Sequence, residues 1–115
     1  MSDAIAYKIL TADQMAVLTA TGSFAGAPID LADGYIHLSA AAQVTETVDK
    51  HFAGQTDLWV AAIDLSRLGD AVKWKPSRGG QLFPHIYAAL PMAAVVAHAP
   101  MTRAADGTVM LPDRV

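Results

Sequence analysis

Apolar residues recur along this chain in two spacings, one typical of strands and one typical of helices. Short apolar runs bounded by glycine, proline or polar residues predict strands. These runs lie at residues 5–10, 35–39, 57–65, 70–75 and 93–101, with one more short strand entered through residues 82–87. The segment DLWVAAIDL (57–65) is almost continuously apolar, which is typical of a central strand buried on both faces.

The first predicted helix runs from Thr11 to Gly22. Thr11 and Gln14 have the spacing of a capping box, in which each side chain binds a free backbone N–H of the other residue. Leu10 can pack against Met15 across the helix start. Gly22 is a plausible end of the helix because glycine readily adopts the left-handed conformation that ends helices.

The second predicted helix follows Ser39, which we expect to be its N-cap, and ends near Gly54. Val44, Val48 and Phe52 recur every four residues, so they form one apolar stripe that faces a core. Residues 24–34 and 76–80 are rich in glycine and proline and are expected to be loops.

The strands and helices do not alternate as regular βαβ units, and the second half is mostly β. This order favours an α+β fold. The length of 115 residues fits one domain, residues 1–115. We expect its core to cover about residues 5–101 and the C-terminal tail, residues 102–115, to be loosely tied.

Composition removes several function classes. Hydrophobic residues make up 53% of the chain, enough for one core, and the net charge of −3 comes with no basic run. General nucleic-acid binding is therefore disfavoured. The chain has no cysteine, so it has no disulfide and no thiolate metal ligand. The most apolar stretch, residues 88–101, contains Pro91 and His98 and is too short to span a bilayer. With no signal-peptide pattern at the start, a cytoplasmic location is expected.

Two short strands carry the candidate chemistry. In the first, Tyr35, His37 and Ser39 alternate with apolar residues, so they share one face. In the second, His85 and Tyr87 share a face in the same way. Both pairings also fit a plain structural role, as a half-exposed face and as an aromatic corner of the core. If they are functional, we expect His37 and His85 to line one pocket.

A third candidate is the loop SRGG. Arg78 can clamp a phosphate or carboxylate with its planar guanidinium, and Gly79 and Gly80 give the loop freedom to close over a ligand. A plain hairpin turn also explains this loop. The remaining histidines, His51 and His98, are expected to be structural. No histidine spacing typical of a zinc site and no GxSxG nucleophile motif is present, so no metal is expected.

The motifs DLADGYIHLSAAAQV and VKWKPSRGGQLFPHIY resemble the family known as domain of unknown function 952, over about residues 7–96. The resemblance implies a fold similar to the ADP-ribosyltransferases and the RNA 2′-phosphotransferases. Those folds have two small, mostly antiparallel sheets around a cleft and two main helices, and they bind NAD or an ADP-ribosylated intermediate.

Carried over to this chain, the resemblance gives roles to individual residues. His37 would contact a ribose hydroxyl, Ser39 would help to hold the nicotinamide side, and Tyr35 or Tyr87 would stack on a ring. His85 would line the same cleft, together with the loop that contains Arg78, Gly79 and Gly80.

The chain departs from the family pattern at four points. Family members often have an acidic residue, a glycine and a tryptophan where this chain has Lys75, Ala88 and Met15. Glu46 is the only glutamate in the chain and lies outside both motifs. Glutamate-dependent ADP-ribosyl transfer is therefore disfavoured, whereas phosphate-directed chemistry, which the RNA 2′-phosphotransferases perform with His and Arg, stays open.

Three hypotheses follow. The first is a transferase with His37 and His85 as catalytic residues and NAD as a candidate substrate rather than a bound cofactor. The second is a non-catalytic module that binds a nucleotide or small anion. The third is a structural or interaction protein. The expected partner is a small nucleotide or phosphate ligand, and the chain is expected to be a monomer or weak homodimer.

Overall fold

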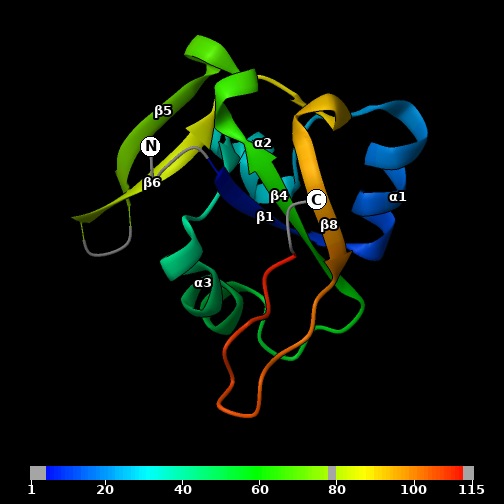
Figure 1. Ribbon diagram of the computed structural model, residues 1–115. Helices are drawn as coiled ribbons and strands as arrows, with labels where there is room; N and C mark the ends of the chain where they lie inside the picture. Colours follow the sequence, from blue (N-terminus) through cyan, green and yellow to red (C-terminus); the bar gives the residue numbers. More distant parts are fainter. Residues whose placement is uncertain (1–4, 78–79, 113–115) are drawn as a thin grey trace.

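The chain forms an α+β fold of small antiparallel sheets and few helices (Figure 1). The computed structural model describes residues 5–77 and 80–112. The strands are β1 (Ile5–Thr11), β2 (Ser23–Phe24), β3 (Ile36–His37), β4 (Leu58–Asp64), β5 (Val72–Ser77), β6 (Gln81–Ile86), β7 (Leu90–Pro91) and β8 (Val95–Pro100). The helices are α1 (Ala12–Thr21), α2 (Pro28–Asp33) and α3 (Val44–His51), and short 3₁₀ turns join several elements.

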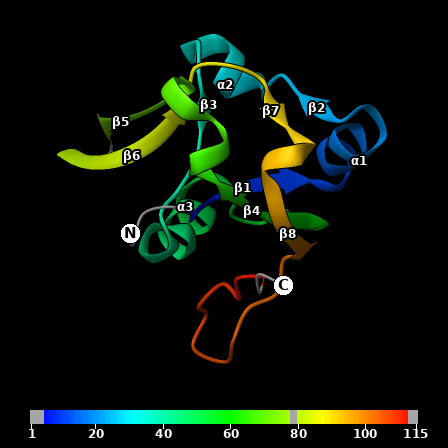
Figure 2. The same cartoon turned by 45° about the horizontal axis from the view of Figure 1, so that its top comes forward.

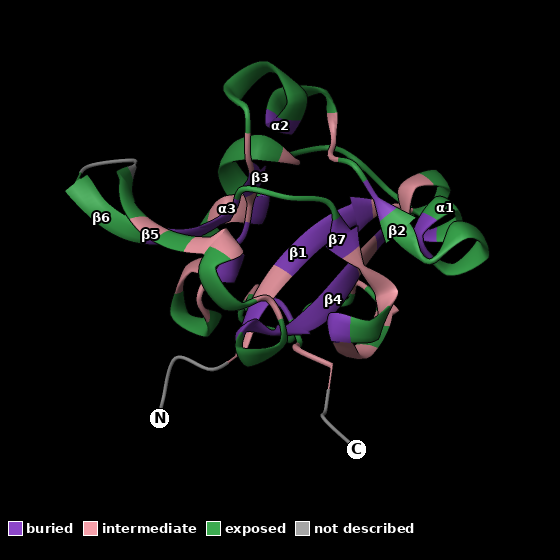
Figure 3. Ribbon diagram, turned by 90° about the horizontal axis from the view of Figure 1, so that it is seen from above, coloured by how far each residue is buried: buried purple, intermediate pink, exposed green. Residues whose placement is uncertain are grey.

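The first sheet has the strand order β1-β4-β8, with every neighbour antiparallel. Its central strand is β4, and all but one of its residues are buried. The prediction of a central strand at residues 57–65 is therefore confirmed. Figure 3 shows β1 and β4 as the most continuously buried ribbons of the molecule.

The second sheet has the order β3-β6-β5, and a two-stranded sheet pairs β2 with β7. The β5–β6 hairpin is buried near its base and exposed towards its tip, which projects from the body (Figures 1 and 3). The resemblance implied two small sheets, whereas the structure has three, because the pair β2–β7 forms a sheet of its own.

The two three-stranded sheets are joined through residues 38 and 39. The Leu38 N–H donates to the carbonyl of Pro84, at 3.0 Å, on β6. Ser39 then forms an isolated antiparallel bridge with Tyr7 on β1, with N···O distances of 2.8 and 2.9 Å. The backbone immediately after His37 therefore changes partners from one sheet to the other, which fixes the two sheets against each other.

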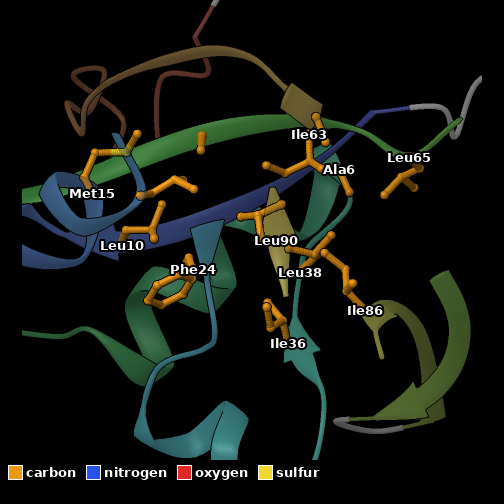
Figure 4. Close-up of a cluster of buried hydrophobic side chains, with 13 residues drawn as sticks. Ala6, Leu10, Met15, Phe24, Ile36, Leu38, Ile63, Leu65, Ile86 and Leu90 are labelled. Atoms are coloured by element: carbon orange, nitrogen blue, oxygen red, sulfur yellow. The ribbon is translucent and has the colours of Figure 1, made fainter. Parts of the chain in front are cut away.

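The main core collects side chains from β1, α1, β2, β3, β4, β6 and β7 (Figure 4). The labelled members are Ala6, Leu10, Met15, Phe24, Ile36, Leu38, Ile63, Leu65, Ile86 and Leu90. Leu10 and Met15 both belong to this cluster, in agreement with the expected packing at the start of the first helix.

The structure confirms the helix predictions that rest on residues close together in the sequence. Thr11 and Gln14 form both hydrogen bonds of the capping box, at 3.0 and 3.1 Å. The helix ends at Gly22, which has the left-handed backbone conformation (φ 80°). In α3, Val44 and Val48 are buried as the stripe predicts.

Other predictions were wrong in detail. Residues 24–34 are not a loop throughout, because they contain α2. Ser39 is not an N-cap, because a 3₁₀ turn, not α3, follows it after one intervening residue and the serine backbone instead pairs with β1. The strand expected at residues 35–39 is only Ile36–His37, and β5 continues to Ser77 where a loop was expected from Pro76.

The C-terminal segment also differs from the prediction of a loose tail. Val109 is only 3% exposed and belongs to a second core cluster with Val44 and Val48. Its N–H donates to the hydroxyl of Thr45, at 3.0 Å. The tail is therefore attached to α3 by apolar packing as well as by a hydrogen bond.

We expect Val109→Ala to lower the free energy of unfolding by about 1–3 kcal/mol, because it leaves a cavity beside Val44 and Val48. Met110→Ala is the control, since Met110 is largely exposed and its truncation is expected to change stability by less than about 0.5 kcal/mol. Urea unfolding of the two variants makes the comparison. Equal stabilities would contradict the structural role of the C-terminal segment.

Candidate functional site

A cleft of about 490 Å³ lies where β1, α2, β3, α3 and β6 come together. Figure 2 shows the chain running from α2 through β3 down to α3. The residues that line the cleft are Tyr7, Lys8, Ile9, Thr11, Gln14, Ala27, Pro28, Ile29, Asp33, Tyr35, His37, Leu38, Ser39, Thr47, His51, Phe52, Gln55, Phe83 and His85.

The strand register brings the two motif histidines together. His37 on β3 lies directly opposite His85 on β6, and directly opposed residues of an antiparallel pair project from the same face. The ring centroids are 5.5 Å apart. Tyr35 stacks on His85 at 4.0 Å and also contacts His37 at 4.7 Å. The expectation that His37 and His85 line one pocket is therefore confirmed.

A buried carboxylate orients His37. Asp30 is 1% exposed, and its Oδ1 lies 2.6 Å from Nδ1 of His37. Its oxygens also accept the backbone N–H groups of His37 and Ala27, at 3.1 and 2.8 Å. The ammonium of Lys8 lies 3.0 Å from the other oxygen and donates to the carbonyl of His37 as well, at 3.0 Å. Lys8, Asp30 and His37 thus form one hydrogen-bonded unit.

The local sequence explains how Asp30 reaches this position. Pro28 occupies the first turn of α2, where a missing N–H costs nothing. Gly26, just before the helix, has φ 132°, and a Cβ added there would lie 2.9 Å from the Cβ of Asp30. A side chain at position 26 would therefore push against the carboxylate, and glycine lets the chain turn into α2 close to it.

The environment of Asp30 keeps it ionised. Burial by itself raises the pKa of this carboxyl. The hydrogen bond from His37, the charge of Lys8 and the backbone N–H groups outweigh burial and hold the pKa of Asp30 well below its usual value. An ionised carboxylate only accepts hydrogen bonds, so the proton in the Asp30–His37 contact is on Nδ1 of the imidazole.

The second nitrogen of His37 faces another carboxylate. Its Nε2 lies 2.9 Å from Oδ2 of Asp33, the last residue of α2. Both ring nitrogens of His37 are therefore held by carboxylates, and Asp30 and Asp33 together fix the orientation of the ring.

His85 is the unusual member of the site. Its side chain is 2% exposed, and neither ring nitrogen has a hydrogen-bond partner among the described residues. Burial, assisted by the nearby charges of His37 and Lys75, lowers the pKa of His85, while Asp33 opposes this shift. The ring is therefore neutral at physiological pH, with one donor and one acceptor nitrogen. Leaving such groups unpaired costs stability.

The other candidate residues from the sequence lie further from the centre of the cleft or have other partners. Ser39 lines the cleft, but its hydroxyl is paired with that of Thr47 at 2.8 Å. Tyr87 is 45% exposed and does not line the cleft. It lines a neighbouring pocket of about 240 Å³, which Tyr35 borders in addition to the cleft. Gly80 lies at the exposed end of the β5–β6 hairpin, beside Gln81, and does not line the cleft. Arg78 and Gly79 lie outside the described residues.

Sequence reasoning missed three residues of the site. Asp30, Asp33 and Lys8 were not among the candidates taken from the sequence. The signal was the run PIDLADG, with proline at one end and glycine at the other, which is the pattern of a short helix. His51, expected to be structural, also lines the cleft, whereas His98 is exposed on β8 and contacts Trp59.

Two features are absent from the described part of the chain. Within residues 5–77 and 80–112, no three His, Asp or Glu side chains gather in an arrangement that suits a metal ion. No helix in this part of the chain is long and apolar enough to cross a membrane.

Comparison with known proteins places the chain in a family. The family model described as "Protein of unknown function (DUF952)" matches residues 9–98. The chain belongs to this family. The match is consistent with the resemblance of the two motifs and extends over β1 to β8.

Solved structures agree with this membership. The crystal structure of protein CC0527 from Caulobacter crescentus has a TM-score of 0.84 at 42% sequence identity, covering 92% of this chain and 93% of that chain. The solution NMR structure of CC0527 has a TM-score of 0.78 at 43% identity, covering 90% of each chain. A search of curated proteins found no match. Any function of this DUF952 chain must therefore be argued from its site.

The pH dependence of stability tests the state of Asp30. As pH falls below about 4, the unfolded state takes up a proton on Asp30 that the folded state resists. Stability is therefore lost as the pH drops, by on the order of 2 kcal/mol for this group. We expect Asp30→Asn to be less stable near neutral pH and to show a flatter decline in acid. Urea unfolding across this range measures both, with the exposed Asp70→Asn as control. An unchanged acid slope in Asp30→Asn would contradict the low pKa.

Replacing His85 tests whether its nitrogens are unpaired. We expect His85→Phe to raise the free energy of unfolding by about 1–3 kcal/mol, because it keeps the ring on Tyr35 and removes two buried polar atoms without partners. The wild type should also lose stability below about pH 6.5, where the unfolded histidine takes up a proton that the folded one resists. The variant should lack that part of the loss. A destabilised variant would mean that the imidazole is a structural hydrogen-bonding group.

Proposed function

We propose that this protein binds a nucleotide of the NAD type in the cleft, in the manner of the ADP-ribosyltransferase-like folds that the motifs resemble. One observation carries the proposal. His85 is buried in the cleft wall, stacked on Tyr35, with both ring nitrogens lacking partners among the described residues. A polar group kept at this cost is more typical of a ligand site than of a core.

The size and lining of the cleft suit such a ligand. Its volume of about 490 Å³ falls within the ~300–1,000 Å³ range of small-molecule pockets. Most of the wall is apolar or aromatic, and a few polar groups converge at one place, as in typical ligand sites. Burial and the charge of Asp33 raise the pKa of Tyr35, so its phenol stays protonated and available as a donor.

In this proposal His37 contacts a ribose hydroxyl and Tyr35 provides an aromatic face for a ring. Ser39 lies beside them, and Tyr87 extends the aromatic surface next to Tyr35 at 5.2 Å. The β5–β6 hairpin, which carries Gly80, adjoins the more exposed phosphate end of the ligand. The protein binds this small molecule as a monomer or weak homodimer.

Group transfer is the second candidate, and the Asp30–His37 pair favours it. An imidazole held by a buried carboxylate at 2.6 Å is oriented in the way that general acid–base catalysis requires. The glutamate typical of ADP-ribosyl transfer has no counterpart in the cleft, since Glu46 is exposed on α3 beside Lys50. Binding without turnover is therefore the main proposal, and ADP-ribosyl or phosphate transfer follows only if turnover is observed.

An NMR titration with NAD, ADP-ribose and mononucleotides tests the binding proposal. We expect saturable amide shifts at residues 35–39 and 81–87 in the wild type, and their loss in His37→Ala. The matched control is His98→Ala, which removes an exposed histidine that does not line the cleft.

The outcomes separate the hypotheses. Shifts that persist in His37→Ala would point to a site elsewhere. Absence of saturable shifts up to about 1 mM ligand would overturn nucleotide binding. If His37→Ala changes only the melting temperature, the motif residues have a structural role. Release of nicotinamide from NAD in the same samples would support the transferase candidate.

A further inference from the structure

The lysine, histidine and aspartate side chains beside His85 in the cleft are held in ion pairs. The charge of Lys75 also acts on His85, but Lys75 does not line the cleft. Lys8 is the only lysine or arginine among the described residues that line the cleft, and its ammonium is held by Asp30 at 3.0 Å. His37 is held between Asp30 and Asp33, at 2.6 and 2.9 Å. The described wall therefore has no unpaired cation for an anionic group, although anion sites usually rely on Arg or Lys donors.

We propose that the part of the cleft around His85 is a subsite for an uncharged group that donates and accepts hydrogen bonds, and that Asp33 excludes anions from it. A sugar hydroxyl pair and a carboxamide both have this chemistry. The inference rests on the proposed nucleotide binding and assigns the uncharged nucleoside end of the ligand to this subsite.

The chemistry of His85 decides the class of ligand group. A neutral imidazole offers one N–H donor and one nitrogen lone pair, so it matches a hydroxyl or an amide. A phosphate monoester dianion offers only acceptors, so it could use the N–H of the ring but not its lone pair. The ring is also stacked on Tyr35, so a ligand group that reaches it meets a largely apolar surface in which desolvating an unpaired charge is costly.

The position of Asp33 adds to this selection. It is the last residue of α2, where the helix end carries partial negative charge. Its carboxylate lines the cleft and occupies the nitrogen of His37 that Asp30 does not hold. Removing this charge while keeping the side-chain shape would take away the carboxylate that faces Nε2 of His37 and repels anions. The variant would then have the anion site that the wild type lacks.

The experiment uses wild type, Asp33→Asn and Asp70→Asn, each titrated by NMR with adenosine, nicotinamide and inorganic phosphate. Asp70→Asn is the matched control, because Asp70 is exposed and does not line the cleft. In the wild type we expect adenosine or nicotinamide to shift the signals of Tyr35, His37 and His85, and phosphate to leave them unchanged. The two uncharged probes distinguish the sugar hydroxyls from the carboxamide as the bound group.

In Asp33→Asn we expect phosphate affinity at these signals to rise about ten-fold or more, as removal of one nearby negative charge predicts. The control should behave as the wild type. Wild-type phosphate binding at His37 and His85 would overturn the inference, as would equal phosphate affinity in wild type and Asp33→Asn. Failure of both uncharged probes to shift these signals would also overturn it.

A parallel titration with NAD keeps the two proposals apart. Binding of NAD together with phosphate binding at His85 would retain the proposed function and remove the subsite assignment. Binding of adenosine or nicotinamide without binding of NAD would retain the subsite and remove the dinucleotide as its ligand.

Discussion

The carboxylate of Asp30 joins three parts of the structure that are distant in sequence. It holds Lys8 on β1, closes the entry to α2 through the N–H of Ala27, and binds both the backbone and the imidazole of His37 on β3. A buried charge with fewer partners would be strongly unfavourable. Because all of these partners must be in place together, the position of β1 relative to β3 and the orientation of His37 are fixed by the same contact.

The two histidines of the cleft differ in their hydrogen-bond partners. His37 has carboxylates at both nitrogens, whereas His85, opposite it in the sheet, has no partner at either nitrogen among the described residues. A core selected only for stability would place an apolar ring beside Tyr35. Natural proteins tolerate such costs chiefly at functional sites, and for this reason the cleft, rather than the exposed hairpin, is the place where function is argued.

Local sequence patterns were reliable where local physics dominates. The capping box of Thr11 and Gln14, the apolar stripe of α3 and the buried run of β4 depend on residues close in sequence, and all three were predicted. Errors fell where tertiary contacts compete with local preference. Ser39 has a good N-cap side chain, yet its backbone pairs with Tyr7 because residues 38 and 39 have to join the two sheets.

The sequence by itself determined that Tyr35 and His37 share a face, and the family motifs indicated that His37 and His85 lie in one pocket. Strand alternation is enough for the shared face. The shared pocket was a hypothesis until the pairing of β3 with β6 placed His37 opposite His85. Only the tertiary structure decided that Asp30 and Lys8 belong to the site, since these residues lie 22 positions apart and no periodic pattern connects them. The sequence also could not predict that His85 is buried without hydrogen-bond partners. The hydrogen-bond environment of a side chain depends on which distant segments fold around it.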